Sequence, residues 1–125
     1  MILLLDAHAL LWWLGDEPKL SGAARAAIAD PANDTLVSAA TVWELAIKQG
    51  LGRLEIAADL VAELDRVGFS RLPVTLEDGA AAGALPPHHR DPFDRMLVAQ
   101  AQRLDALVVT RDRAFAAYGI NVLTA

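Results

Sequence analysis

The sequence contains no cysteine among its 125 residues. A disulfide framework and a zinc site built from cysteine thiolates are therefore both excluded. It also lacks an apolar run of the roughly 18 residues that a membrane span requires. The first residues, MILLLDAH, lack the basic segment that opens a secretory signal. These absences predict a cytoplasmic protein with no membrane partner.

Positive charge is also scarce. The chain has 11 Lys and Arg residues against 16 Asp and Glu residues, which gives a formal net charge of −5. Proteins that hold nucleic acid through their overall charge need a basic footprint, so this mode of binding is excluded. Any role on nucleic acid must come from a local site, where bound divalent cations can supply positive charge.

Apolar residues, in contrast, make up 54% of the sequence, above the about 45 to 50% of ordinary soluble domains. Much of this fraction is alanine, which adds little apolar area per residue. The excess hints at a surface buried against a partner. The length suits one domain over residues 1–125, with a core of its own.

Short apolar runs alternate with helical stretches along the chain. We expect strands at residues 2–5, 35–38, 69–74, 106–110 and 120–124. We expect helices at residues 8–15, 22–29, 39–50, 56–67, 76–85 and 92–104, with a short one before Gly119. The alternation predicts an α/β fold: a three-layer α/β/α sandwich around a mainly parallel sheet of about five strands.

Local signals mark where several helices begin and end. Ser21 and Ser38 are expected to cap the helices that follow them. Asp91 precedes Pro92, and proline is favoured at the first helical position, so Asp91 is also expected to be a cap. The helix expected over 56–67 carries its apolar residues, Ala57 among them, on one face.

Four acidic residues fall near strand ends or in the helix turns that follow strands. Asp6 and Asp112 stand at or just beyond the ends of two apolar runs. Glu44 lies in the second turn of a helix that leaves another strand, and Asp94 lies in the first turn of the helix after Pro92. Because the functional crevice of an open parallel sheet lies outside the carboxyl ends of its strands, we expect these acids to meet there.

Four carboxylates in one place would repel each other unless they were protonated or neutralised. Mg²⁺ and Mn²⁺ are the natural neutralisers, because both prefer oxygen ligands. A bound cation of this kind can activate water and stabilise charge that grows on a phosphate. Phosphodiester hydrolysis is therefore the leading chemistry.

Each acid also has a purely structural interpretation. Glu44 could pair with Lys48 at the favourable i, i+4 spacing on an exposed helix face. The other three acids could each end a strand or support the start of a helix. Asp91 is best explained as a helix cap outside the metal site. Only the joint placement of the four acids favours catalysis.

Basic residues close to these acids in the sequence could contact a nucleic-acid strand or a partner, or could simply be exposed charges that favour solubility. They are Lys48, Arg53, Arg90, Arg95, Arg111 and Arg113. His88 and His89 are poor candidates for metal ligands, because adjacent histidines in a loop rarely point at one ion. A place on the rim beside Arg90, or in a solvated loop, explains them better.

Four segments together resemble a known family. LLLDAHALLWWL, VSAATVWELAIKQGLGRL, HHRDPFDRMLVAQA and LVVTRDRAF occur in the order and spacing of PIN-domain proteins. They look most like the VapC-type ribonuclease toxins of toxin–antitoxin pairs. The resemblance implies a PIN-like α/β/α sandwich, RNA cleavage that depends on Mg²⁺ or Mn²⁺, homodimerisation and inhibition by a cognate antitoxin.

The resemblance also implies roles for single residues. The family's metal-binding and catalytic acids fall on Asp6, Glu44, Asp94 and Asp112, with support from Thr110 and Asp91. In-line attack on an RNA phosphodiester by metal-activated water is the implied mechanism. The candidate contacts to RNA or to the antitoxin are then Lys48, Arg53, Arg90, Arg95 and Arg111.

One residue departs from the family pattern. Close relatives usually have Thr after the first Asp, where this chain has Ala7. The change removes a hydroxyl beside the site but no metal ligand, and it leaves the efficiency of catalysis open.

The sequence also raises two other possible functions. A phosphoacceptor receiver domain needs an acidic pair after the first strand and a lysine after the last strand. This chain offers a lone Asp6, and its last residues, INVLTA, contain no lysine. A PIN-fold interaction module without catalytic activity stays open, although the presence of all four acids weighs against it.

Overall fold

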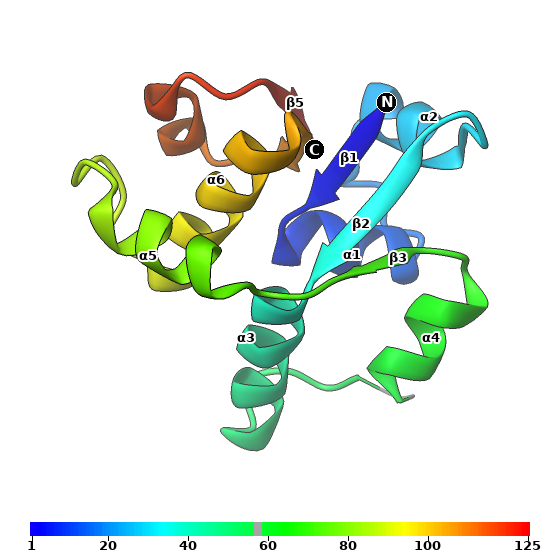
Figure 1. Cartoon of the computed structure of the whole chain (residues 1–125). Helices are drawn as coiled ribbons and strands as arrows, with labels where there is room; N and C mark the ends of the chain where they lie inside the picture. The colour runs from blue at the N-terminus through cyan, green and yellow to red at the C-terminus, as the bar shows by residue number, and fades with distance from the viewer. Residues whose placement is uncertain (57–58) are drawn as a thin grey trace.

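The structure is a computed structural model that describes residues 1–56 and 59–125 (Figure 1). The predicted helical position of Ala57 lies outside the described residues. In chain order the elements are β1 (Ile2–Leu5), α1 (Ala7–Leu14), α2 (Gly22–Ala29), β2 (Asp34–Ser38), α3 (Ala39–Gly50), α4 (Leu60–Arg66), β3 (Ser70–Leu72), α5 (Leu76–Ala84), α6 (Pro92–Leu104), β4 (Leu107–Thr110), the 3-10 helix η1 (Arg113–Tyr118) and β5 (Val122–Thr124).

The strands form one five-stranded sheet in the order β3-β2-β1-β4-β5, and every neighbouring pair is parallel. The predicted α/β class is therefore confirmed. β1 lies at the centre, and Leu3, Leu4 and Leu5 are fully buried, as expected of a strand covered on both faces. Parallel pairing puts the carboxyl ends of all five strands at one edge of the sheet.

Two hydrophobic cores lie on the two faces of the sheet, and β1 contributes to both. Leu3 and Leu5 belong to the core that includes residues of α1, α2, α3 and α4, whereas Leu4 belongs to the core with α6 and η1. This division follows from the alternation of side chains along a strand. Figure 1 shows the two helical layers, with α5 packed on the outer side of α6. The predicted three-layer sandwich is confirmed.

Several predicted elements are shorter than expected, among them α4, β3 and β5, which spans Val122–Thr124 rather than residues 120–124. α4 begins at Leu60 rather than at residue 56, because the Asp59 side chain accepts hydrogen bonds from the backbone N–H groups of Val61 and Ala62. β3 ends at Leu72, before Pro73, a residue that cannot donate to a strand ladder.

Helix length also bears on the prediction of no membrane partner. The longest described helix, α6, has 13 residues, whereas a membrane-spanning helix needs about 20. Within residues 1–56 and 59–125, no helix combines the length and the apolar character that crossing a membrane requires.

Candidate functional site

Asp6 and Asp112 lie at the carboxyl ends of the neighbouring strands β1 and β4. Asp6 caps α1 through Oδ1, which accepts from the backbone N–H of Ala9 at 2.8 Å. Asp112 caps η1 through Oδ1, which accepts from the N–H of Ala114 at 2.9 Å. Capping therefore occupies one oxygen of each carboxylate, and the second oxygen stays available for other contacts. The structural and the functional interpretation of these acids are compatible.

Thr110 connects the two strand ends. Its hydroxyl donates to Asp6 Oδ2 at 2.5 Å and accepts from the backbone N–H of Asp112 at 3.0 Å. Burial raises the pKa of Asp6, while the hydrogen bonds from Thr110 and Ala9 act in the opposite direction. One buried hydroxyl thus orients the Asp6 carboxylate and fixes the chain at Asp112.

Glu44 is buried on α3 although it carries a carboxylate, with 9% of its surface exposed. Its Oε2 lies 3.0 Å from Nζ of Lys48, one helical turn later. The predicted i, i+4 pair therefore exists, but the acidic partner faces the interior rather than solvent. A buried carboxylate of this kind requires a cationic partner.

Asp94 lies in the first turn of α6. As predicted, Asp91 caps this helix, and its Oδ1 accepts from the N–H groups of Phe93 and Asp94. The pKa of Asp94 is raised to about 7, chiefly by burial. The negative charges of Asp91, Glu44 and Asp6 also raise this pKa, and His89 opposes them. Glu44 and Asp6 are therefore within electrostatic range of Asp94.

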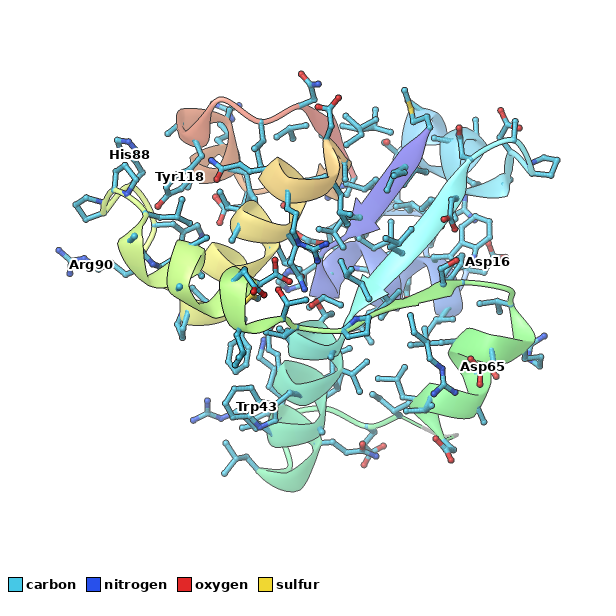
Figure 2. The ribbon with its side chains drawn as sticks, viewed as in Figure 1. Asp16, Trp43, Asp65, His88, Arg90 and Tyr118 are labelled. Carbon is cyan, nitrogen blue, oxygen red and sulfur yellow. The ribbon has the colours of Figure 1, made fainter. Side chains whose placement is uncertain are left out.

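His89 lies between two of the acids, which corrects the expectation of a rim position or a solvated loop. Its Nε2 is 2.8 Å from Asp112 Oδ2 and 3.0 Å from Asp94 Oδ2, and only 15% of its side chain is exposed. His88, in contrast, is exposed, with its ring against Tyr118 (Figure 2). The adjacent histidines therefore do not act as a pair, in agreement with the argument from spacing.

The donor set suits a hard divalent cation. One carboxylate oxygen each of Asp94 and Asp112 lies within 4.8 Å of the other and of Nε2 of His89, and the charges of Asp6 and Glu44 act on Asp94. The pKa of Asp112 is lowered, first by the hydrogen bond from Ala114 and also by His89, so this acid is ionised at neutral pH. Oxygen ligands in excess favour Mg²⁺ or Mn²⁺ over softer metals.

Among the predicted basic contacts, two guanidinium groups are engaged within the chain. Arg111 donates to the carbonyl groups of Ala125 and Lys19 and lies 4.4 Å from the centre of the Trp12 ring. Arg95 donates to the carbonyl groups of Ala82, Gly83, Leu85, Pro86 and His89. These bonds give both residues a structural role.

The other predicted basic contacts differ in exposure. Arg53, Arg90 and Arg113 are exposed, and Figure 2 shows Arg90 pointing away from the body of the protein. Lys48 is half-buried, and its ammonium group is paired with Glu44. Of the predicted basic contacts, these three arginines are exposed and make no side-chain hydrogen bond to another described residue.

Comparison with known proteins gives a consistent pattern. The model of the PIN domain family matches residues 3–121. The chain is 33% identical over 113 residues to Ribonuclease VapC22 of Mycobacterium tuberculosis, covering 88% of this chain and 86% of that protein.

Solved structures share the fold at lower identity. VapBC2 from Rickettsia felis, bound to a DNA fragment from its promoter, matches with a TM-score of 0.71 and 14% identity, covering 98% of both chains. DNA-bound VapBC from Salmonella typhimurium matches with a TM-score of 0.67 and 17% identity, covering 98% of this chain and 97% of that chain.

Proposed function

Because the chain belongs to the PIN domain family, we propose that it is an endoribonuclease that hydrolyses RNA phosphodiester bonds and depends on Mg²⁺ or Mn²⁺. The observation that carries the proposal is the gathering of acids at the carboxyl edge of the sheet, where Asp6, Asp94 and Asp112 come from three different elements. A relative that is one-third identical is named a ribonuclease, which supports the choice of RNA as substrate.

Four acids of this chain would hold the metal: Asp6, Glu44, Asp94 and Asp112. When bound, a divalent cation lowers the pKa of water and offsets charge that grows on the phosphate. Asp6 is already oriented by its capping bond and by Thr110, so little of its side-chain freedom remains to be lost when a cation binds.

Asp94 has a separate role in the metal-free protein. Its raised pKa, about 7, lets it hold a proton near neutral pH. A protonated Asp94 reduces the repulsion among the buried acids, and it can release the proton when positive charge arrives. The helix cap at Asp91 determines where this carboxyl points, since it fixes the first turn of α6.

RNA contacts on such an acidic chain must be local. We assign them to the exposed arginines Arg53, Arg90 and Arg113, whose guanidinium groups can bind phosphate. With few phosphate contacts, binding of RNA should weaken only moderately as the salt concentration rises. Salt titration of RNA binding, with alanine at each of these arginines, tests the assignment.

We also propose that the chain is the toxin of a toxin–antitoxin pair and forms a homodimer. The similarity to the VapBC structures supports a cognate antitoxin as partner. Exposed apolar side chains, among them Trp43 at 64% and Leu51 at 63%, support assembly, because burying them against a partner is favourable. Light scattering on the purified chain should give the mass of two copies, and one copy at all concentrations would contradict the homodimer.

RNA cleavage by the purified chain tests the activity. We expect cleavage with Mn²⁺ or Mg²⁺, none with EDTA, and a loss of at least about a hundredfold for Asp94→Asn. Asp91→Asn is the matched control, because Asn also caps helices and the residue lies in the same turn. Both variants should retain the circular dichroism spectrum of the parent.

Three outcomes would contradict the proposal in different parts. Cleavage that survives Asp94→Asn would show that Asp94 is not catalytic. Cleavage that persists in EDTA would show that the reaction does not depend on a metal. A parent chain that binds the antitoxin but cleaves no RNA under any condition would favour the inactive interaction module.

A further inference from the structure

We propose that His89 is a positioning residue that holds the carboxylates of Asp94 and Asp112 together, and that it is not a metal ligand. The inference deepens the proposed function and rests on its metal site. It starts from the place of the imidazole ring between two acids that belong to different elements, Asp94 on α6 and Asp112 at the start of η1.

The hydrogen bonds of the ring define which nitrogen carries the proton. Nδ1 of His89 accepts from the backbone N–H of Asp91 at 3.1 Å. An accepting nitrogen carries no proton, so the ring proton lies on Nε2. Nε2–H then donates toward Asp112 Oδ2 and Asp94 Oδ2, at 2.8 and 3.0 Å. A protonated nitrogen has no lone pair for a metal, so His89 is a donor to the acids.

Contacts on the other sides hold the ring in this orientation. The backbone N–H of His89 donates to the hydroxyl of Tyr118 at 2.8 Å, and that hydroxyl donates to the Pro86 carbonyl at 2.7 Å. The ring meets Phe115 edge to face, with the centroids 5.8 Å apart. Arg95 donates to the His89 carbonyl at 3.2 Å. The loop is thus fixed to both η1 and α6.

The acids need this support because they repel each other and because one of them is partly exposed. The Asp112 side chain is 44% exposed, and its Oδ2 bonds to His89. Without a shared donor, Asp112 could rotate toward solvent, and ordering it again would reduce the affinity for a cation. Groups that orient metal ligands in this way typically affect metal affinity about 10- to 100-fold.

The test is Mn²⁺ binding by the full chain, measured by isothermal titration calorimetry. His89→Phe keeps an aromatic ring beside Phe115 but has no donor, and His89→Leu is a second variant without a donor. His89→Gln restores an N–H donor. We expect the dissociation constant for Mn²⁺ to rise about tenfold or more in His89→Phe and His89→Leu. In His89→Gln it should return toward the value of the parent.

His88→Phe is the matched control, because it makes the same change at the exposed neighbour and should leave Mn²⁺ binding unchanged. Thermal unfolding in EDTA checks that each variant folds. A variant that folds and binds Mn²⁺ as tightly as the parent, with Phe or Leu at position 89, overturns the proposal.

Pulsed electron paramagnetic resonance of bound Mn²⁺ separates a donor from a ligand. We expect no coupling between the bound Mn²⁺ and a nitrogen of a directly bound imidazole. Such a coupling in the parent, together with an equal loss of Mn²⁺ affinity in His89→Gln and His89→Phe, would make His89 a ligand and overturn the proposal. RNA cleavage is scored separately, so a chain that shows the binding pattern without cleavage contradicts the ribonuclease and leaves the role of His89 intact. A parent that binds no Mn²⁺ contradicts both.

Discussion

The hydroxyl of Thr110 donates a hydrogen bond to Asp6 at 2.5 Å, between residues that are 104 positions apart in the sequence. The same oxygen accepts from the backbone N–H of Asp112. Support for the first acid therefore comes from β4, the strand beside β1. The residue after Asp6 is Ala7, which has no hydroxyl. Thr110 supplies a hydroxyl to the Asp6 carboxylate from the neighbouring strand.

Replacing Thr110 tests this relationship. Thr110→Val keeps the shape but removes both hydrogen bonds, so we expect Mn²⁺ affinity and RNA cleavage to fall by about tenfold. The free energy of unfolding, measured with urea, should fall by about 1 kcal/mol. Thr110→Ser keeps the hydroxyl and should lose much less of both. Equal behaviour of the Val and Ser variants would show that the hydroxyl does not position Asp6.

Asp94 should make stability depend on pH in the metal-free protein. Its pKa is about 7 in the folded chain, against an ordinary value of 3.8. The folded state binds this proton more tightly, so the stabilisation is complete below the ordinary pKa and is lost as the pH rises through about 7.

Asp94→Asn cannot ionise and should therefore be more stable than the parent near pH 8 in EDTA. We expect a difference of about 1 to 2 kcal/mol, after allowing for solvent screening of a partly exposed group. The difference should become small near pH 4. Urea unfolding at both pH values measures it, and a difference that does not change with pH would contradict the assignment.

The acids at strand ends were accessible from sequence because each depends on local rules. A wholly apolar run that stops at Asp6 and another that stops before Asp112 predict where buried parallel strands end. Asp91 followed by Pro92 predicts a capped helix start, and the helical geometry then gives the direction of Asp94. Their assignment to metal binding remains a prediction.

His89 was not accessible in the same way. Its ring is held by Tyr118 and Phe115, which come from η1, and its loop is held by the guanidinium of Arg95. No local pattern in the sequence predicts contacts between segments so far apart in the chain. Only the hydrogen bond from the Asp91 N–H to Nδ1 is local, and it becomes informative once the helix cap is known. The carbonyl partners of Arg95 and Arg111 are likewise defined by the fold, and no local pattern in the sequence predicts them.

Lys48 should contribute most to the stability of the protein when no metal is bound. Lys48→Met leaves the buried Glu44 carboxylate without its cationic partner, so we expect the metal-free protein to lose about 1 to 2 kcal/mol of stability. Lys48→Arg keeps a positive charge and should lose less. Because a cation at Glu44 would replace the missing charge, thermal unfolding with added Mn²⁺ should narrow the gap. A gap that Mn²⁺ leaves unchanged would place Glu44 outside the metal site.

Asp78 contrasts with Asp94, because it is a buried acid whose hydrogen-bond partners join α5 to α6. It completes a capping box with Thr75 on α5, and its two oxygens bind Arg103 of α6 at 2.7 and 3.0 Å. The hydrogen bonds from Arg103, above all, lower the pKa of Asp78 to about 2. Its stabilisation is therefore present above the ordinary pKa of 3.8 and is lost as the pH falls through about 2.

Asp78→Asn should lower the free energy of unfolding by about 2 to 3 kcal/mol near neutral pH, because a charged hydrogen-bond network loses one partner. RNA cleavage per folded molecule should stay unchanged, since the described bonds of the Asp78 side chain go to Thr75, Gln100 and Arg103 and to none of the four candidate acids. Asp94→Asn is expected to do the reverse, with higher stability and no cleavage. Urea unfolding and cleavage assays on both variants compare them directly. Loss of cleavage with Asp78→Asn, in a variant that remains folded, would mean that this network also positions the site through α6.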